Sequence, residues 1–507
     1  MKCKVLISAL LAGVVLPLGA QETYENTNLL DNDLNGTARY VGMGGALEAL
    51  GADISTISTN PAGLGLFRHS VANASFGFVS QSDAKEFAPG NTTNMSFDQG
   101  GFVYSTRNGA KSYLNFGFNY HKSRNFDWLL DAASSLNNAS QNKLTYEKYR
   151  NDVFSKDDDA SFSQVDNFYM KHLLYNDATK AYYYYPATAY TFNRAQQGYI
   201  GEYDFNVSGN LDDRIFLGLT VGVHDVHYRH YSEYTENVTS IGNLTLADSR
   251  KITGTGVDVK LGAIFRPMAE SPFRIGIYVQ TPTWYDLTTK NYTEMTDGST
   301  TAKSSESYDF KVYMPWKFGV SLGHTVGNFL ALGATYEFTD ITSMDTRIND
   351  GDSYYDSWYG TYYQSSSSDD AMNHHTDKNL KGIHTVKLGL EYKPIPTLAL
   401  RVGYNYISSM FKDGAAKDGT VWSPGTYYAS STDYTNWKDT NRFTLGLGYT
   451  IGKFNLDLAY QYTATNGDFF PFQSYTDDKD ASDDNIANAV KVSNKRNQLL
   501  FTLGYRF

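Results

Sequence analysis

Apolar and polar side chains alternate along the last eleven residues of the chain, 497–507. The apolar positions are Leu499, Phe501, Leu503, Tyr505 and Phe507, and the positions between them include Gln498, Thr502, Gly504 and Arg506. Successive side chains of a β-strand point to opposite faces, so one face of this segment is apolar and the other is polar or small. An apolar outer face, a polar inner face and an aromatic residue at the rim are typical of a transmembrane β-barrel strand. The alternative is the final strand of a soluble β-sandwich.

The same alternation recurs in segments that short turns join in pairs. The expected strands span residues 71–80, 96–106, 111–121, 199–208, 214–227, 254–265, 273–284, 316–324, 329–338, 384–392, 398–406, 443–451, 454–462 and the C-terminal segment. Asn108-Gly109, between the second and third of these, is a typical hairpin turn. Gly452-Lys453 joins the pair that precedes the last segment.

The number of segments and the lengths of their connections predict the fold class. About fourteen strands is an even number, as closed single-chain bacterial barrels have. Connections of a few residues alternate with connections of about a dozen to about seventy, which matches short periplasmic turns and long external loops. The sequence therefore predicts an all-β, membrane-spanning antiparallel barrel of about 14 strands with both chain ends on the periplasmic side.

The N-terminus is typical of a secretory signal peptide. Lys2 and Lys4 precede an apolar stretch over residues 5–18, and Ala20 offers a small residue for cleavage before Gln21. The alternative is a retained anchor, for which the stretch is short. The expected organisation is therefore a signal peptide over 1–20, a periplasmic-side hatch or plug over 21–69 and a barrel with long extracellular loops over 70–507.

Composition narrows the function classes. The single cysteine, Cys3, lies in the expected signal peptide, so the mature chain has no disulfide or cysteine metal site, and no cysteine lies at the cleavage point for lipid attachment. The mean hydropathy of −0.44 is too low for a helical membrane protein. The 41 tyrosines suit the aromatic girdles of a barrel. The net charge of −11 argues against a nucleic-acid partner, whose binding needs a basic face.

Charged residues on the expected inner faces form a second feature. These candidate lumen residues are Lys387, Glu391, Arg401 and Asp457. The structural interpretation, which we favour for each charge taken singly, is a solvated lumen with ordinary ion pairs. The functional interpretation is a polar path or a binding site for a carboxylate.

The segment before the first strand is rich in small residues and shows no strand alternation. Its motif residues are Gly44, Gly45, Asp53, Asn60, Pro61, Ala62 and Gly63. Thr37 is expected to cap a short helix over 46–50, which Gly51 ends. Small residues allow close packing inside a narrow tube, which favours a plug in the lumen; the alternative is a soluble periplasmic tail.

Three features resemble the FadL/TodX family of outer-membrane transporters for long-chain fatty acids and other hydrophobic compounds. They are the segment from Ala38-Arg39 through Met43-Gly44-Gly45-Ala46 and Asp53 to Asn60-Pro61-Ala62-Gly63-Leu64, the sequence Gln280-Thr281-Pro282-Thr283, and the pattern of strands that ends in Phe507. Together they span nearly the whole mature chain. The loops are longer than in the better-known members, and the family's carboxylate ligands have no residue-by-residue match here.

The resemblance implies a mechanism. A hydrophobic molecule lands on the external loops, moves to an inner pocket above the hatch, and leaves sideways into lipid through a gap beside an inward-kinked strand. Residues 111–124 form the candidate strand, with Gly117, Asn119 and His121 facing inward. The terminal Phe507 resembles the C-terminal signal that bacterial outer-membrane barrels present to the barrel-assembly machinery.

The longest expected loop, residues 125–198, holds a candidate ligand groove. Its apolar residues are Trp128, Leu129, Phe168, Met170 and Leu173, in clusters that suggest helical stripes. The functional interpretation is an external landing groove for a lipophilic ligand. The alternative, of about equal weight, is a loop that packs its own core over the mouth of the barrel.

The sequence gives less support to haem binding and to catalysis. His374-His375 suggests a haemin receptor, because histidine ligates haem iron. Exposed paired histidines, however, are more often solvated. The sequence contains no HExxH or GxSxG motif and no triad that spacing can assemble, so no enzyme is expected. We expect no cofactor and no metal. The leading function is passive uptake of hydrophobic small molecules across a bacterial outer membrane; the alternative is a barrel scaffold or shuttle for surface-protein export.

Overall fold

A computed structural model describes residues 22–30, 33–154, 163–356, 361–476 and 483–507, with no side-chain placement over 350–364. The expected signal peptide, with Cys3, lies outside these residues. Within the described residues, no helix has the length and apolar character needed to cross a membrane.

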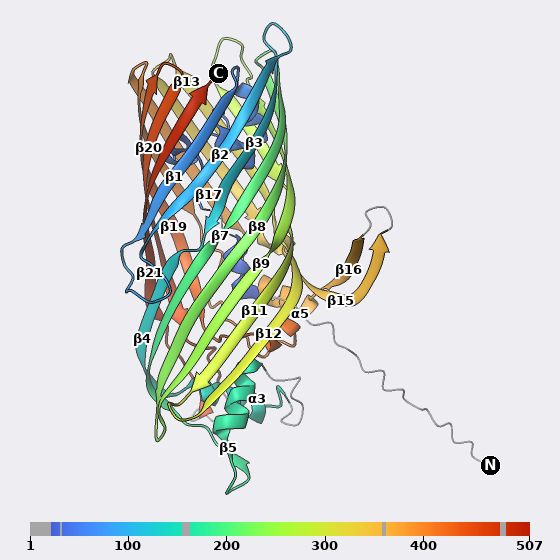
Figure 1. Cartoon of the computed structure of the whole chain (residues 1–507), viewed down its shortest axis with the longest axis vertical. Helices are drawn as coiled ribbons and strands as arrows, with labels where there is room; N and C mark the ends of the chain where they lie inside the picture. The colour runs from blue at the N-terminus through green and yellow to red at the C-terminus, as the bar shows by residue number, and fades with distance from the viewer. Residues whose placement is uncertain (1–21, 31–32, 155–162, 357–360, 477–482) are drawn as a thin grey trace, which may run out of the picture.

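Fourteen antiparallel strands close into a barrel, as the sequence predicts (Figure 1). They are β1 (Val71–Gln81), β2 (Thr93–Arg107), β3 (Tyr113–Asn125), β7 (Ala187–Leu211), β8 (Ile215–Val238), β9 (Gly242–Phe265), β10 (Arg274–Gln280), β13 (Trp316–Val326), β14 (Leu330–Asp340), β17 (Ile383–Ile395), β18 (Leu398–Ile407), β19 (Tyr434–Ile451), β20 (Phe454–Phe470) and β21 (Val490–Arg506). The first and last strands pair from Val71↔Arg506 to Gln81↔Arg496, which closes the wall.

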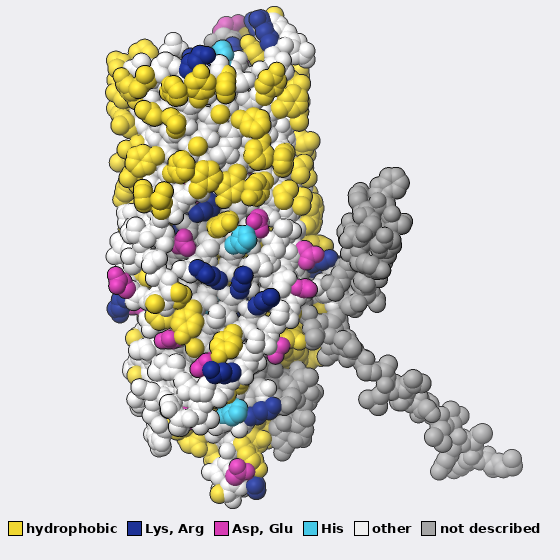
Figure 2. Space-filling view, viewed as in Figure 1, with side chains coloured by type: hydrophobic (Ala, Val, Ile, Leu, Met, Phe, Trp, Pro, Cys, Tyr) yellow, Lys and Arg dark blue, Asp and Glu magenta, His cyan; other side chains and the backbone are white. Residues whose placement is uncertain are grey.

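Outward-facing apolar side chains form a belt around the end of the barrel that carries the C-terminus (Figure 2). Its exposed members include Phe76, Phe205, Leu217, Leu261, Val320, Leu445 and Phe501. Along β21 the outward Leu499, Phe501 and Leu503 are exposed and the inward Gln498 and Thr502 are buried, as alternation predicts. Toward the loop end the surface becomes polar and charged.

Several expected loops are in fact strand. β7, β8 and β9 continue far beyond the belt, and a further sheet extends the wall through β4 (Trp128–Ala139), β11 (Trp284–Thr296), β12 (Thr301–Tyr313), β15 (Asp345–Asp356) and β16 (Thr361–Ser368). The helical stripe expected near Trp128 is therefore wrong. Outward side chains beyond the belt face water, so these extensions lack the apolar alternation by which a lipid-facing strand is recognised.

Helices and short strands cover the loop end. They are α3 (Gln141–Arg150), α4 (Gln164–Tyr169), the π-helix η4 (Met170–Leu174), η5 (Ile341–Ser343), α5 (Asp370–Asn379), α6 (Pro424–Tyr427), β5 (Tyr175–Asn176) and β6 (Ala181–Tyr182). Apolar side chains from α3, α4 and η4 pack with β7 and β20 residues such as Phe192 and Phe469. This loop-end core gives the outer part of the barrel an interior of its own.

The N-terminal segment lies inside the barrel. It comprises α1 (Thr23–Leu30), α2 (Ala38–Gly42) and the 3₁₀ turns η1 (Ile54–Ser58) and η2 (Pro61–Leu66). Thr37 does cap a helix, accepting a hydrogen bond from the backbone N–H of Tyr40, but the helix is α2 and not the expected one over 46–50. From here on, residues 33–66 are called the plug.

The plug backbone lies directly against glycines of the wall. A side chain added at Gly333 of β14 would meet the carbonyl oxygen of Ala46 at 1.9 Å, and one at Gly389 of β17 would meet that of Met43 at 2.3 Å. Gly323, Gly333, Gly389 and Gly403 stand opposite one another across four successive strands. We call this row the glycine seat. Because these residues have no side chains, the backbone of the wall and the backbone of the plug come into contact.

We expect Gly333→Ala to loosen the plug, because overpacking of this kind costs about 1–3 kcal/mol. Leu47 is fully buried in the plug, and a Leu47→Cys probe in a background without Cys3 reports its exposure. The rate of labelling by a water-soluble maleimide should rise about tenfold or more in the Gly333→Ala background.

Gly504→Ala on β21 is the matched control, since the nearest atom to its added side chain would lie at an ordinary 3.5 Å. Equal labelling rates for both alanine variants would contradict the glycine seat.

Candidate functional site

The ladder between β2 and β3 stops partway along the two strands. Pairing runs from Arg107↔Tyr113 to Gln99↔His121. Beyond that point β2 continues against β1 alone and β3 against β7 alone. A register shift falls on each strand here, leaving Asp98 of β2 and Ser123 of β3 as extra residues. We call this interruption the seam.

The seam is closed from inside by the plug. The Asn35 side-chain amide donates to Asp98 Oδ1 at 2.9 Å and to the Lys122 carbonyl at 3.0 Å. The backbone N–H of Asp33 donates to the Ser123 carbonyl at 2.8 Å. Lys122 Nζ reaches across to Ser96 Oγ at 2.6 Å. Side chains and plug backbone thus replace the ladder hydrogen bonds that the two strands do not make.

Apolar rings cover the outer side of the seam. Phe97 of β2 is 44% exposed and stacks on Tyr120 of β3, with ring centroids 5.7 Å apart and an interplanar angle of 10°. Met95, 70% exposed, lies on the same outer face of β2. The seam therefore faces the side of the wall that carries the apolar belt.

A lumen cavity of ≈ 80 Å³ lies behind the seam, and Asn35, His121, Ser123 and Glu202 contribute to its lining. Leu30 and Leu34 of the N-terminal segment also line it. A second cavity of ≈ 70 Å³ lies at the mouth, between α1 and the loop-end strands. Both are far smaller than the roughly 300–1,000 Å³ of pockets that enclose drug-sized ligands.

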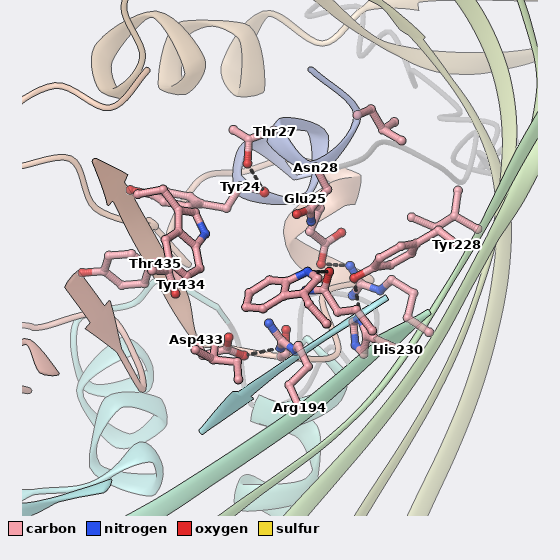
Figure 3. A pocket seen from close by; sticks show the side chains of 18 of the residues that line it. Tyr24, Glu25, Thr27, Asn28, Arg194, Tyr228, His230, Asp433, Tyr434 and Thr435 are labelled. Atoms are coloured by element: carbon pink, nitrogen blue, oxygen red, sulfur yellow. Dashed lines mark hydrogen bonds and ion pairs between the residues drawn. The ribbon is translucent and has the colours of Figure 1, made fainter. Parts of the chain in front are cut away.

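Figure 3 shows the mouth cavity with Tyr24 of α1 and Tyr434 close together on one side of it. The ring of Tyr24 stacks on Phe411 at 5.3 Å, and a further contact at 5.1 Å joins it to Tyr434. Arg194 and Asp433, also labelled in Figure 3, form an ion pair at 2.7 Å in the lining of the same cavity. The first helix thus occupies an aromatic and charged mouth.

The residues expected to form an external groove lie mostly in the interior. Trp128, Leu129, Phe168 and Met170 are buried and Leu173 is partly buried. All except Leu129 belong to or pack against the loop-end core. Trp128 also lines the mouth cavity, where its indole N–H donates to Gln196 at 2.7 Å.

The expected lumen charges pair with one another and with the plug. Lys387 Nζ lies 3.0 Å from Glu48 of the plug, and Arg39 of the plug lies 3.2 Å from Glu391. Arg401 joins Glu391 at 2.7 Å and Asp457 at 2.6 Å. In this arrangement the charges fix the plug to β17, β18 and β20.

The motif residues of the plug have local structural roles. Asp53 caps η1 by accepting from the Ser55 N–H, and Asn60 caps η2 by accepting from the Ala62 N–H. Gly44 and Gly45 have φ of 63° and 79°, and Gly63 packs on Thr56. Pro61 and Ala62 lie against Gly218 of β8, whose added side chain would meet Pro61 at 2.3 Å.

The inward residues of the candidate strand, Gly117, Asn119 and His121, each begin a row of residues that face one another across neighbouring strands of the wall. Cross-strand register places His121 opposite Glu202 and Glu202 opposite His224. The next row contains Asn119 and Asp204, and the third begins at Gly117, which packs on Leu64 of the plug. Sequence reasoning placed the β3 residues inward but missed their β7 and β8 partners, because register is not visible in a single strand.

One of the paired histidines, His375, has no free ring nitrogen. His375 is buried; its Nδ1 lies 2.9 Å from Thr23 Oγ1 and its Nε2 lies 3.1 Å from the Ala416 carbonyl. Both ring nitrogens therefore bind within the protein, which leaves this imidazole no atom for haem iron.

No model of a known protein family matches the sequence, and no curated protein does. Among solved structures, a FadL homologue of Pseudomonas aeruginosa is similar, with a TM-score of 0.51 and 12% identity over 94% of this chain and 100% of that chain. The toluene transporters TbuX of Ralstonia pickettii (TM-score 0.49, 14% identity, 94% and 99% covered) and TodX of Pseudomonas putida (0.48, 12%, 94% and 99%) also match. The chain has the fold of this FadL homologue, whose family its sequence motifs resemble.

The loop-end core contains a carboxyl group that titrates in the physiological range. Glu236 lies beyond the belt on β8 and accepts hydrogen bonds from Tyr234, the Gln141 N–H and Asn142. Burial raises its pKa from 4.5 to about 7. A raised carboxyl pKa stabilises the folded state below the unfolded pKa, and this contribution is lost as pH rises through about 7.

We therefore expect the loop-end core to open more readily at pH 8.5 than at pH 5.5, by about 2 kcal/mol at most. Hydrogen exchange of β8 residues near Glu236 measures this opening. Glu236→Gln should flatten the pH dependence, whereas Glu233→Gln, on the partly exposed face of the same strand, should preserve it. An unchanged pH dependence in Glu236→Gln would show that another group is responsible.

Proposed function

We propose that the chain is a multi-pass channel of the Gram-negative outer membrane through which hydrophobic small molecules, such as long-chain fatty acids, enter passively and leave sideways into lipid. The observation that carries the proposal is the seam, a break in the wall that the plug closes from inside. Its outer side bears Phe97 and Met95 at the apolar belt, and its inner side adjoins the lumen cavity. A lateral exit suits an apolar molecule because the molecule need not cross water.

The route requires movement of the N-terminal segment. The mouth and lumen cavities of ≈ 70 and ≈ 80 Å³ are too small for a long apolar chain, and α1 or residues of the plug line both. Displacement of α1 would enlarge the mouth, and release of Asn35 from Asp98 and Lys122 would open the seam. The glycine seat holds the opposite side of the plug, so opening at the seam leaves the polar channel closed.

Further features support the membrane setting. Phe507 is 64% exposed, its N–H donates to the Ser70 carbonyl at 3.0 Å, and its ring lies edge-on to Tyr505. A rim aromatic in this place suits both contact with outer-membrane lipid and recognition by the barrel-assembly machinery. The fold of the FadL homologue and the absence of expected catalytic motifs favour a channel over an enzyme.

A reversible crosslink across the seam tests the lateral route. Ser96→Cys and Lys122→Cys place thiols on the two strands in a background without Cys3. A short bis-maleimide linker with a reducible centre should abolish transfer of a fluorescent fatty acid into proteoliposome membranes, and reduction should restore it. The same linker between Thr444→Cys and Gln461→Cys, opposite each other in the continuous part of the β19–β20 ladder, should leave transfer unchanged.

Transfer that survives the seam crosslink would exclude the lateral exit. Absence of fatty-acid and aromatic-hydrocarbon transfer by the unmodified protein, together with loss of surface proteins from a deletion strain, would instead favour the scaffold or shuttle role.

A further inference from the structure

The inner face of β3, β7, β8 and β9 carries a buried cluster of ionisable residues that hydrophobic transport does not require. Its members are His121, Glu202, Asp204, His224, Asp258 and Lys260. His121, Glu202 and His224 stand directly opposite one another on three neighbouring strands. All six side chains are at least nine-tenths buried, so each charge here has lost most of its hydration.

Lys260 neutralises one side of the cluster. Its ammonium lies 2.6 Å from Glu202 Oε1, 2.7 Å from Asp258 Oδ1 and 3.2 Å from Asp204 Oδ1. Gly222 makes room for it, since a side chain there would meet Lys260 Nζ at 2.7 Å. Three carboxyl groups share one ammonium, so acidic groups outnumber the cation within the cluster when both imidazoles are neutral.

The other oxygens of Glu202 and Asp204 face the histidines at distances longer than hydrogen bonds. His121 Nε2 lies 3.5 Å from Glu202 Oε2, and His121 Nδ1 lies 3.6 Å from Asp204 Oδ2. His224 Nδ1 lies 3.9 Å from Glu202 Oε2. Among the described residues, His121 Nδ1, His224 Nδ1 and Asp204 Oδ2 are buried without a hydrogen-bond partner. Two ligand atoms on one tetrahedral zinc ion are separated by about 3.3 Å, close to the spacing between a His121 nitrogen and the carboxylate oxygen that it faces. One ligand atom each from His121, Glu202 and Asp204 lies within 4.8 Å of the other two.

His224 is held beside the cluster by hydrogen bonds of its own. His224 Nε2 lies 2.9 Å from Asp258 Oδ2, which also accepts from Gln280 at 2.7 Å and Thr283 at 3.3 Å. The bond to Asp258 fixes the His224 ring with Nδ1 directed toward Glu202.

From this geometry we propose that His121, Glu202 and Asp204, with His224 beside them, bind a divalent first-row transition metal ion such as Zn²⁺. Imidazole and carboxylate ligands suit such ions, and the ion adds positive charge where carboxyl groups outnumber the ammonium. His121 and Glu202 line the lumen cavity, which gives the ion a path to the site. Because His121 ends the β2–β3 ladder, the ion ties β3 to β7 directly below the seam.

Titration of the purified, tag-free barrel with Zn²⁺ in detergent, followed by calorimetry, tests the site. We expect one ion per chain and affinity at least about tenfold lower in His121→Gln and in Asp204→Asn. His384→Gln, an exposed histidine on β17, is the control and should bind as the unmodified protein does. The use of two single variants keeps the test valid if one of them fails to give a heat-modifiable, folded barrel.

A zinc-edge anomalous difference peak in crystals of the soaked protein then locates the ion. A peak between His121, Glu202 and Asp204 supports the site. The proposal is overturned by stoichiometric binding that both variants retain, by a peak elsewhere, or by no binding at all. The cluster would then be an ion-pair network around Lys260. No hydrophobic ligand is present in this experiment, so its failure is distinct from failure of the uptake test.

Discussion

A barrel wall in an apolar surrounding must satisfy its backbone hydrogen bonds, and this constraint governs the site as well as the fold. An unpaired N–H or C=O without access to water costs several kcal/mol, or roughly 1–3 by protein mutational data. The seam between β2 and β3 breaks the ladder, yet Asn35 and the backbone of Asp33 supply hydrogen bonds to the strands there. One part of the wall is thus completed by residues of the plug.

The two sides of the plug are held by different forces. On the side of β13 to β18, plug backbone sits on wall glycines, and Lys387 and Arg401 add ion pairs near Glu48 and Glu391. On the seam side, side-chain hydrogen bonds predominate. Close packing is lost at once when surfaces separate, whereas polar groups that part can exchange their bonds for water. In the proposed route, the plug would therefore yield on the seam side while its seat stays in place.

Strand register decides which polar groups share the lumen. The alternation of β3 alone turns Gly117, Asn119 and His121 inward, but the pairing of β3 with β7 sets His121 opposite Glu202. A shift of one residue would turn these side chains outward to the apolar belt, where charges are costly. The same register that builds the wall therefore concentrates carboxylates and imidazoles behind the seam.

The sequence by itself determined the barrel, the number of its strands and the inward or outward direction of most side chains, because alternation is a local property of each strand. It also identified the small-residue character of the plug and the charges at Lys387 and Arg401. The tertiary structure alone decided where the strands continue beyond the belt, that Trp128 lies in a strand, and that the break in the wall falls at Asp98 and Ser123. These features depend on register and on contacts between residues far apart in the chain, such as Asn35 with Asp98 and Ala46 with Gly333. Local alternation carries no information about either.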